Sequence, residues 1–389
     1  MGFIYGLALL LVIFEGIITE CEGAPRRNLP HLPREIIEVI ISKTDFRTIQ
    51  QTVREFLFPP NDIVMSKILQ DDLIEIWPFI GRRIHEYQHG SDTMLSLGNY
   101  DALTSFFNKF GDKIKRVRVH VYSRYNDGLH DNIIPDIIKR YAQNFEELRI
   151  ACCNDLGFWE KLSDEENDII FPEVKKFQFW GDSFRNEFKL NLLFPKLESI
   201  ELEGNVADIN CLENVKGLKE LLLHTPSIKE DQLDGIFANN GNMTMISLKS
   251  PTRAATMNSI SKHLTNLKTL AVNDPGKDFL LRANNGPVYT ISSMHHLAIS
   301  CDGTREVFGI GNLSLDVPNL KEFTFEANED YERIVEIIAQ FKKLETLELS
   351  LENYNVFECL QKFKQIVEFR TKAYKNRFQN LEIFFRRSR

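Results

Sequence analysis

A short pattern of apolar and polar residues recurs along the carboxy-terminal two thirds of the chain. Each copy has apolar residues at its first, fourth and sixth positions, as in LKELLL at residues 218–223 and LETLEL at residues 344–349. This alternation predicts a half-buried β-strand, because successive side chains of a strand point to opposite faces of its sheet. Ten copies begin at residues 114, 145, 174, 197, 218, 243, 267, 294, 320 and 344, and a weaker copy spans residues 366–369.

The even spacing of the copies predicts one repeated structural unit. Their first positions run from residue 114 to residue 366 and are about 25 residues apart. We expect positions four and six of each copy to be buried, and positions three and five to face outward. Helical patterns between the copies occur at residues 227–237, 330–341 and 353–363. Residues 225–227, together with Glu230, are expected to cap the first of these helices.

A period of about 25 residues resembles that of leucine-rich repeats, whose units are roughly 20–29 residues long. The resemblance implies that each unit is a strand followed by a return segment, and that stacked units build a core that no single unit could bury. We therefore expect an α/β fold, a leucine-rich-repeat solenoid or horseshoe over residues 112–389, preceded by an all-α segment. A parallel α/β sheet of another kind is the alternative.

The segment before the repeats has a helical pattern. In residues 29–58, Leu32 and Pro33 come first, and Ile36, Ile37 and Ile40 follow on one stripe of a predicted helix. This arrangement resembles the F-box, a helical motif that opens with Leu-Pro and an Ile-Ile pair. The resemblance implies an F-box-like segment over residues 29–100, in which these five residues bind a Skp-type adaptor of a cullin–RING ubiquitin ligase. The alternative is a helical cap that seals the first repeat.

The first residues are typical of an export signal. Residues 3–14 form an uncharged apolar run that is too short to span a bilayer, and residues 1–25 contain no Lys or Arg. We predict a signal peptide over residues 1–23, a mature chain that begins near Ala24, and no membrane insertion after cleavage. An N-terminal helix packed on the fold is the alternative.

The cysteines do not match an extracellular scaffold. Six cysteines occur without regular spacing, and Cys211, Cys301 and Cys359 have the surroundings of ordinary buried thiols. Free thiols favour a reducing compartment, whereas the apolar leader predicts secretion. The combination of leader, F-box-like helices and repeats resembles the secreted F-box–leucine-rich-repeat effectors of gall-forming insects. That resemblance implies secretion followed by action in the cytoplasm of a host cell.

Charge and motifs give no sign of catalysis. The net charge of −8 does not favour nucleic-acid phosphates. His295 and His296 are neighbours on a predicted strand, so they would point to opposite faces and share no metal. The sequence GDSF at residues 181–184 is similar to the nucleophile turn of a hydrolase, but the downstream Asp-x-x-His that such an enzyme needs is missing. We expect no catalytic residue, cofactor or metal site; a hydrolase is a third alternative.

These parts together predict a non-catalytic adaptor. Its N-terminal helices would bind the Skp-type adaptor, and the concave face of the repeats would bring an unidentified target protein to the ligase. The alternative is an extracellular repeat protein that binds a ligand, for which Asn242 and Asn312 in sequons would be glycosylated if exposed. The residues expected on the concave face are Arg116, Arg118, His120 and Arg149 as a basic cluster, then Trp180, Glu201, Glu203, Leu222 and His224, and finally Glu322, Glu326 and Glu348.

We expect the paired change Leu32→Ala and Pro33→Ala to abolish binding of a Skp-type adaptor, because the F-box resemblance puts both residues in the contact. The measurement is capture of purified adaptor by the full chain, with circular dichroism as the test of folding. A variant that unfolds, or that binds the adaptor as well as the unaltered chain, would show that residues 29–58 cap the repeats.

Overall fold

The computed structural model describes part of the 389-residue chain: residues 73–76, 95–96, 104, 107–122, 133–153, 158, 162, 169–181, 189–204, 209–225, 228–250, 252–273, 288–300, 315–326, 340–351 and 382–387. The chain divides into two compact units, Met1–Lys67 and Ile68–Arg389, and every described residue belongs to the second. The weaker motif copy at residues 366–369 lies outside the described residues, as do the residues expected to bind a Skp-type adaptor, Leu32, Pro33, Ile36, Ile37 and Ile40.

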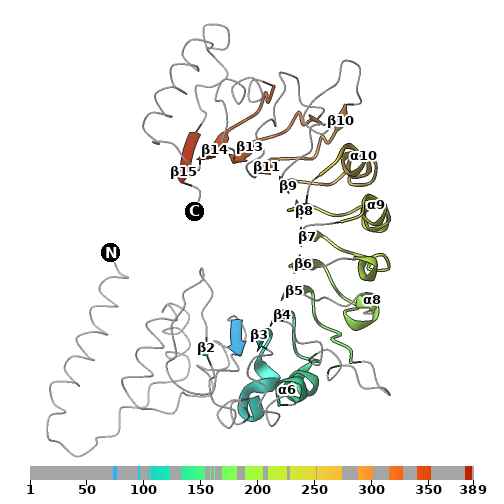
Figure 1. The fold of residues 1–389 in the computed structure, drawn as a ribbon, viewed down its shortest axis with the longest axis vertical. Coiled ribbons are helices and arrows are strands. Elements are labelled where there is room, and N and C mark those ends of the chain that lie inside the picture. Colours follow the sequence, from blue (N-terminus) through green and yellow to red (C-terminus); the bar gives the residue numbers. More distant parts are fainter. Residues whose placement is uncertain are drawn as a thin grey trace, which may run out of the picture. The chain divides into compact units, whose positions relative to one another are not determined.

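One parallel sheet of 13 strands organises the second unit. Its strand order is β15-β14-β13-β11-β9-β8-β7-β6-β5-β4-β3-β1-β2, so most neighbours in the sheet are also consecutive in the sequence (Figure 1). A separate pair consists of β10 (Tyr289–Thr290) and β12 (Leu315–Asp316). The strands of the large sheet are β1 (Leu73–Ile76), β2 (Leu95–Ser96), β3 (Arg116–Tyr122), β4 (Glu147–Cys153), β5 (Lys176–Gly181), β6 (Ser199–Glu203), β7 (Glu220–His224), β8 (Met245–Leu248), β9 (Thr269–Asn273), β11 (His296–Ser300), β13 (Glu322–Glu326), β14 (Thr346–Leu351) and β15 (Glu382–Arg387).

The described helices connect strands of this sheet. The α-helices α8, α9 and α10 lie on the same side of the strands (Figure 1). The buried apolar residues of α9 are Leu233, Ile236 and Phe237, and those of α10 are Met257 and Ile260. No helix in the described part of the chain has the length and hydropathy needed to cross a membrane. The helices are η1 (Gly111–Lys113), α6 (Ile133–Tyr141), α8 (Leu190–Leu193), η3 (Asn210–Leu212), α9 (Glu230–Asn239) and α10 (Ala254–His263).

The core consists of apolar rows that run across the sheet. Each of the ten full motif copies contains a strand, and the parallel pairing aligns the fourth position of each copy with the fourth position of the next, as in Phe177, Ile200 and Leu221. The sixth positions align in the same way, as in Phe179 beside Leu202. These side chains are almost completely buried, so the alternation in the sequence corresponds to a continuous core. The fourth-position row is Val117, Leu148, Phe177, Ile200, Leu221, Ile246, Leu270, Leu297, Phe323 and Leu347.

Backbone hydrogen bonds repeat the same register where each strand begins. The amide of the second residue in a motif copy donates to the carbonyl of the second residue in the preceding copy. Glu146 N donates to Lys115 O at 2.7 Å, and Lys175 N donates to Glu146 O at 2.8 Å. Because each bond joins equivalent residues of successive copies, the bonds align the strands from one edge of the series to the other. The later donors are Glu198, Lys219, Thr244, Lys268, His295, Lys321 and Glu345.

The fold class predicted from the sequence is wrong in the form stated, a leucine-rich-repeat horseshoe behind an all-α segment over residues 29–100. Strands β1 and β2 lie within that segment, and β1 pairs with β3 in the large sheet. The described part of the chain is one continuous parallel sheet with few helices, which is an α/β fold. The physical reason is that β1 pairs the backbone groups of β3, and the sheet then ends in β2, which has only two residues and leaves few groups unpaired. Buried Leu73 helps to hold β1 in place.

The start of α9 also differs from the expectation. The helix begins at Glu230, and its N-cap residue is Lys229, whose side chain makes no capping hydrogen bond. The N-cap is therefore not among residues 225–227, of which 226 and 227 lie outside the described residues. Glu230 lies 3.7 Å from Arg253, before α10, as an ion pair. The expectation of a buried thiol is confirmed for Cys211, in η3. Cys301 and Cys359 lie outside the described residues.

Asn240, at the end of α9, joins one repeat unit to its neighbour. Its side chain is 3% exposed. Its amide nitrogen donates to the carbonyls of Val215 and Ile236, both at 2.9 Å, and its oxygen accepts from the amide of Leu218 at 2.9 Å. Val215 and Leu218 precede β7, whereas Asn240 precedes β8. A single buried amide thus satisfies backbone groups that the loop before β7 leaves unpaired.

Replacing Asn240 by Ala should lower the free energy of unfolding by about 3 kcal/mol, because buried backbone groups lose their partners and Ala offers none. The measurement is urea denaturation of the full chain. The matched control is Asn239→Ala. Asn239 is exposed and makes one bond, to Glu213 O at 2.7 Å, so its loss should cost less than about 1 kcal/mol. Equal effects of the two changes would contradict the structural role of Asn240.

Candidate binding face of the sheet

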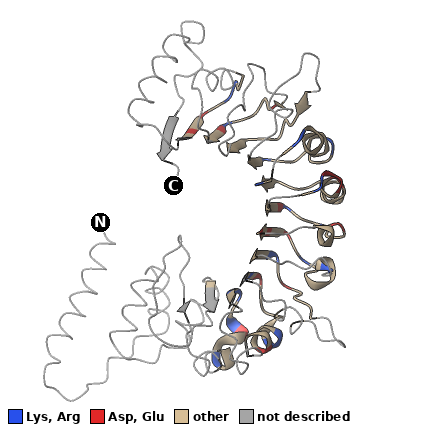
Figure 2. Cartoon of the chain, in the orientation of Figure 1, with Lys and Arg blue, Asp and Glu red and all other residues tan. Residues whose placement is uncertain are grey.

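The side of the sheet opposite the apolar rows carries polar and charged residues, and we call it the polar face. It is formed by the third, fifth and seventh positions of successive motif copies, which the strand register arranges in rows. Neighbouring residues in a row lie on adjacent strands, which are about 4.8 Å apart. Charged residues occur along the strands as well as on the helices (Figure 2). The middle row reads Arg118, Arg149, Gln178, Glu201, Leu222, Ser247, Ala271, Ala298, Thr324 and Glu348.

A buried carboxylate lies among the basic residues of β3 and β4. Arg116 Nε donates to Glu147 Oε2 at 2.7 Å, and Arg149 Nε donates to Glu147 Oε1. Burial alone would raise the pKa of Glu147, but the guanidinium groups of Arg149 and Arg116 outweigh it and hold that pKa below the usual value. Glu147 is therefore charged at neutral pH. The cluster predicted to be basic is an ion network in which one acid offsets part of the positive charge.

Trp180 in β5 contacts a cation on β3. The guanidinium carbon of Arg118 lies 5.1 Å from the centroid of the Trp180 ring, which is a cation–π contact. Ala151 of β4 pairs with Trp180, and its small side chain lies on the strand between Arg118 and the ring. One face of the indole is therefore already covered by Arg118. The contact also fixes the guanidinium on the polar face, where it can meet a partner.

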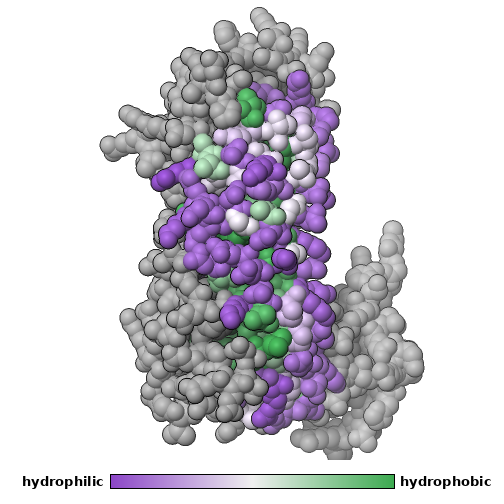
Figure 3. All heavy atoms as spheres, turned by 90° about the vertical axis from the view of Figure 1, so that its right-hand side faces the viewer, coloured by the Kyte–Doolittle hydropathy of each residue, from purple (hydrophilic) through white to green (hydrophobic). Residues whose placement is uncertain are grey.

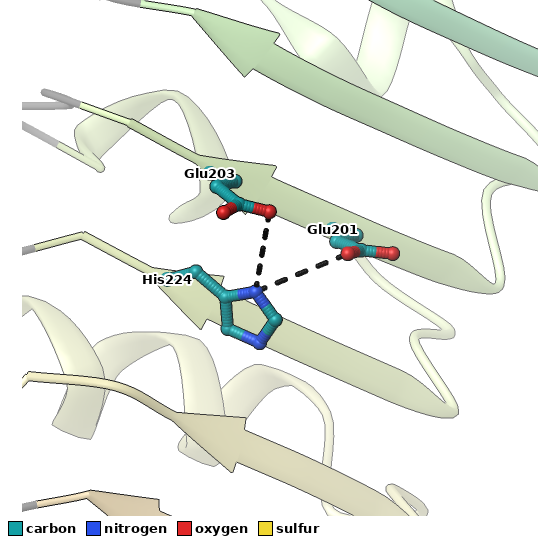
Figure 4. A group of neighbouring side chains, drawn as sticks. All are labelled: Glu201, Glu203 and His224. Carbon is teal, nitrogen blue, oxygen red and sulfur yellow. Dashed lines mark ion pairs between the residues drawn. The ribbon is translucent and has the colours of Figure 1, made fainter. Parts of the chain in front are cut away.

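His224 at the end of β7 lies between two carboxylates of β6 (Figure 4). Its Nδ1 is 3.7 Å from Glu203 Oε2 and 3.9 Å from Glu201 Oε1, and its Nε2 is 3.4 Å from Ser247 Oγ. Burial lowers the pKa of His224 and Lys249 lowers it further; Glu201 and Glu203 raise it but do not overcome these two effects. The imidazole is therefore neutral at neutral pH.

The centre of the polar face carries no charge in its middle row. Leu222, Ser247, Ala271, Ala298 and Thr324 follow one another across β7, β8, β9, β11 and β13, and each is half-buried. We call these five residues the uncharged strip. Glu201 precedes the strip in the row and Glu348 follows it. Small side chains dominate it, so another molecule could approach the sheet closely there.

The structure places the expected binding residues on the polar face, in separate groups. Arg116 and Arg149 join the network of Glu147, and Arg118 contacts Trp180. His120 lies in the same row as Trp180, two strands away. Glu201, Glu203 and His224 form the group at β6 and β7, and Leu222 begins the uncharged strip. Glu322 and Glu326 lie on β13 on either side of Thr324, the last residue of the strip, and Glu348 follows Thr324 on β14.

Sequence reasoning missed three residues that complete these groups. Glu147 occupies the third position of its motif copy, so strand alternation already predicted that it faces outward. Gln178 donates from Nε2 to Glu201 Oε2 at 2.7 Å, and Ser247 contacts His224. Their importance depends on the neighbouring strand, which a pattern within one copy does not reveal. Aligning the copies with one another would have found all three.

The helix-bearing side of the sheet differs from the polar face. Figure 3 shows it as largely hydrophilic, with small, separate apolar patches. Among the described residues, the large exposed hydrophobic side chains are Ile170, Leu192 and Val288. Scattered single apolar residues are common on protein surfaces and do not indicate a binding site. The described part of this side therefore offers no extended apolar surface for a partner.

No protein-family model matches this chain, and a search of curated proteins finds no match. The likeness to F-box and leucine-rich-repeat proteins is therefore a likeness of sequence pattern. The side chains and charges of the polar face are the features that bear on function.

Replacing Glu147 by Ala should lower the free energy of unfolding at neutral pH by about 3 kcal/mol, because it leaves two guanidinium groups without their buried partner. The pKa of Glu147 is lowered in the folded chain. Its contribution is therefore fully present above the ordinary carboxyl pKa and is lost as the pH falls through the lowered value. Urea denaturation at neutral and acidic pH should show the difference between the two proteins shrinking in acid.

The control for this comparison is Glu198→Ala. Glu198 forms an ion pair with Lys219 at 2.8 Å, but its side chain is 43% exposed. Exposed pairs contribute less than about 1 kcal/mol because water and salt screen them. A loss at Glu147 no larger than that at Glu198 would mean that the network does not stabilise the sheet.

Proposed function

We propose that this chain is a binding protein that holds a protein partner on the polar face of its sheet, with the uncharged strip at the centre of the contact. The observation that carries the proposal is the order of side chains in the middle row. Half-buried uncharged residues from Leu222 to Thr324 are bordered by Glu201 and Glu348. Interfaces between proteins commonly have such a weakly charged centre within a polar rim.

The small side chains of the uncharged strip favour a partner that approaches the sheet closely. Ser247, Ala271 and Ala298 are small, so a partner's backbone or side chains can lie directly over β8, β9 and β11. Leu222 supplies apolar area at one end of the strip. Trp180 lies two strands from Leu222 and adds an aromatic group near the same end. Aromatic and apolar anchors supply most of the energy of a typical protein interface.

The distribution of charge favours one orientation of the partner. Arg116 and Arg118 lie half-buried on β3, whereas Glu322 and Glu348 lie on β13 and β14. A partner with acidic groups at the first end and basic groups at the second would meet opposite charges at both. Complementary charges of this kind speed the encounter and reject the reversed orientation. We therefore propose a protein partner of that polarity.

The fate of the bound partner is a proposal from sequence pattern alone. The likeness of residues 29–58 to an F-box supports recruitment of the partner to a ubiquitin ligase through a Skp-type adaptor. The apolar leader at residues 3–14 supports secretion, and in an effector the host cytoplasm would be the site of action. If residues 29–58 only cap the fold, the same polar face would serve an extracellular binding protein.

The combined change Trp180→Ala and Leu222→Ala should weaken binding of the partner about tenfold or more, because it removes the apolar anchors at one end of the contact. The partner is first captured with a photo-crosslinking residue at Ser247 of the full chain. Its affinity for the two proteins is then measured by calorimetry. Melting temperature tests whether the variant is folded.

The matched control puts the photo-crosslinking residue at Ala238, an exposed position of α9 on the helix-bearing side. This position should not capture the partner. Capture from Ala238 but not from Ser247, or unchanged affinity of the double variant, would place the binding surface elsewhere.

A further inference from the structure

Three potential metal ligands converge at the end of β6 and β7. Figure 4 shows Glu201, Glu203 and His224 with their polar ends directed toward one another. One ligand atom from each can be chosen so that all lie within 4.8 Å of one another, and Nδ1 of His224 is 3.7 Å and 3.9 Å from the two carboxylates. It is the group of three potential metal ligands found among the described residues, and it combines one histidine with two acids.

The surroundings of His224 leave one of its ring nitrogens, Nδ1, without a hydrogen bond. Its Nδ1 is buried and makes no hydrogen bond. Its Nε2 lies 3.4 Å from Ser247 Oγ, so the ring can donate its single proton there. In that tautomer Nδ1 keeps a lone pair available for a metal ion, and one carboxylate oxygen of each glutamate lies within 4 Å of it. A cation between the three groups would meet one donor atom from each.

We propose that Glu201, Glu203 and His224 bind a divalent transition-metal ion of the zinc class on the polar face. An imidazole nitrogen with two carboxylates is a donor set suited to Zn²⁺ and its neighbours. Ca²⁺ and Mg²⁺ prefer oxygen donors throughout. Zinc lies about 2.0–2.2 Å from such donors, so donors in a tetrahedral site are about 3.3–3.6 Å apart. The distances of His224 Nδ1 to the carboxylates exceed this by a few tenths of an ångström, which small side-chain rotations can close.

The residues around the three ligands support this assignment. Gln178 Nε2 donates to Glu201 Oε2 at 2.7 Å and orients that carboxylate, as outer residues of metal sites do. Gly204 follows Glu203 with φ +119°, and a Cβ there would meet Gly181 O at 1.9 Å, so the backbone beside the ligand is tightly constrained. Three protein ligands leave a coordination position for water or for a group of another molecule.

Lys249 opposes metal binding. Its Nζ lies 4.0 Å from Glu203 Oε1, so it already supplies part of the positive charge that the carboxylates attract. It is 52% exposed, however, and can move into solvent when a divalent ion binds. Removing its charge should therefore tighten metal binding. A purely structural role for the cluster would not produce this gain.

The chain contains a matched control in His296. Its Nδ1 lies 3.8 Å from Glu322 Oε2, and its Nε2 lies 3.4 Å from Thr324 Oγ1. This group repeats the hydroxyl and one carboxylate around a histidine, but in the described part of the chain no second acid completes it as a three-ligand group. Both His296 and Glu322 are also more exposed than His224. A site that needs two carboxylates should depend on His224 and not on His296.

The test is titration of Co²⁺ into the full chain after removal of metals with a chelator. Cobalt is used because its visible absorption reports its coordination, and because a separate charge-transfer band would reveal binding to any of the six cysteines. We expect one Co²⁺ per chain, bound without the thiolate band, and competed by Zn²⁺ but not by Ca²⁺. The bound ion should also raise the melting temperature, since it binds the folded chain.

The variants decide the assignment. Glu203→Gln and His224→Ala should each weaken Co²⁺ binding at least tenfold, and Gln178→Ala should weaken it about tenfold. His296→Ala should leave Co²⁺ binding unchanged. Lys249→Met should strengthen it. Glu203 is 44% exposed, so Glu203→Gln keeps the test valid even if His224→Ala does not fold. Absence of Co²⁺ absorption, a thiolate band, or binding that survives Glu203→Gln would overturn the proposal.

Discussion

The in-register parallel pairing of the strands is the constraint on which the rest of the structure depends. Each strand pairs with its neighbour so that Phe177 meets Ile200 and Ile200 meets Leu221, and never with a shift of one residue. Such a shift would turn the apolar row toward solvent and bury the charged row, so the free energy of burial opposes it strongly. The register in turn decides which polar side chains become neighbours on the opposite face.

A parallel sheet is usually covered on both faces, and its strands are then apolar throughout. In this sheet every second row is polar, and its charged side chains pair with side chains of neighbouring strands. Arg116 pairs with Glu147, and Gln178 with Glu201, although 31 and 23 residues separate the partners in sequence. Exposed ion pairs just before the strands, such as Lys219 with Glu198, follow the same register. They contribute little to the stability of the fold, because water screens them. The buried network at Glu147 therefore matters more to the sheet than the larger set of surface pairs.

The two proposals meet at β6 and β7. Glu201 borders the uncharged strip and also belongs to the group of possible metal ligands. A divalent ion there would cancel the negative charge at that end of the strip, and its remaining coordination position would face the same side as the strip. The ion would then alter the charge that a partner meets. The two functions are nevertheless separable, since the metal depends on His224 and the partner contact on Leu222.

The sequence by itself determined where the repeated strands lie and which of their side chains point inward. Alternation within a motif copy is a local property, and it correctly buries Leu221 and Leu223 while leaving Leu222 on the other face. It did not predict β1 and β2, because neither strand belongs to a full copy of the six-residue motif. Only the tertiary structure decided which polar side chains of neighbouring copies make contact. The positions of Glu147 between two arginines and of His224 between two carboxylates follow from contacts across strands, and the charge of each group depends on those neighbours rather than on its own copy of the motif.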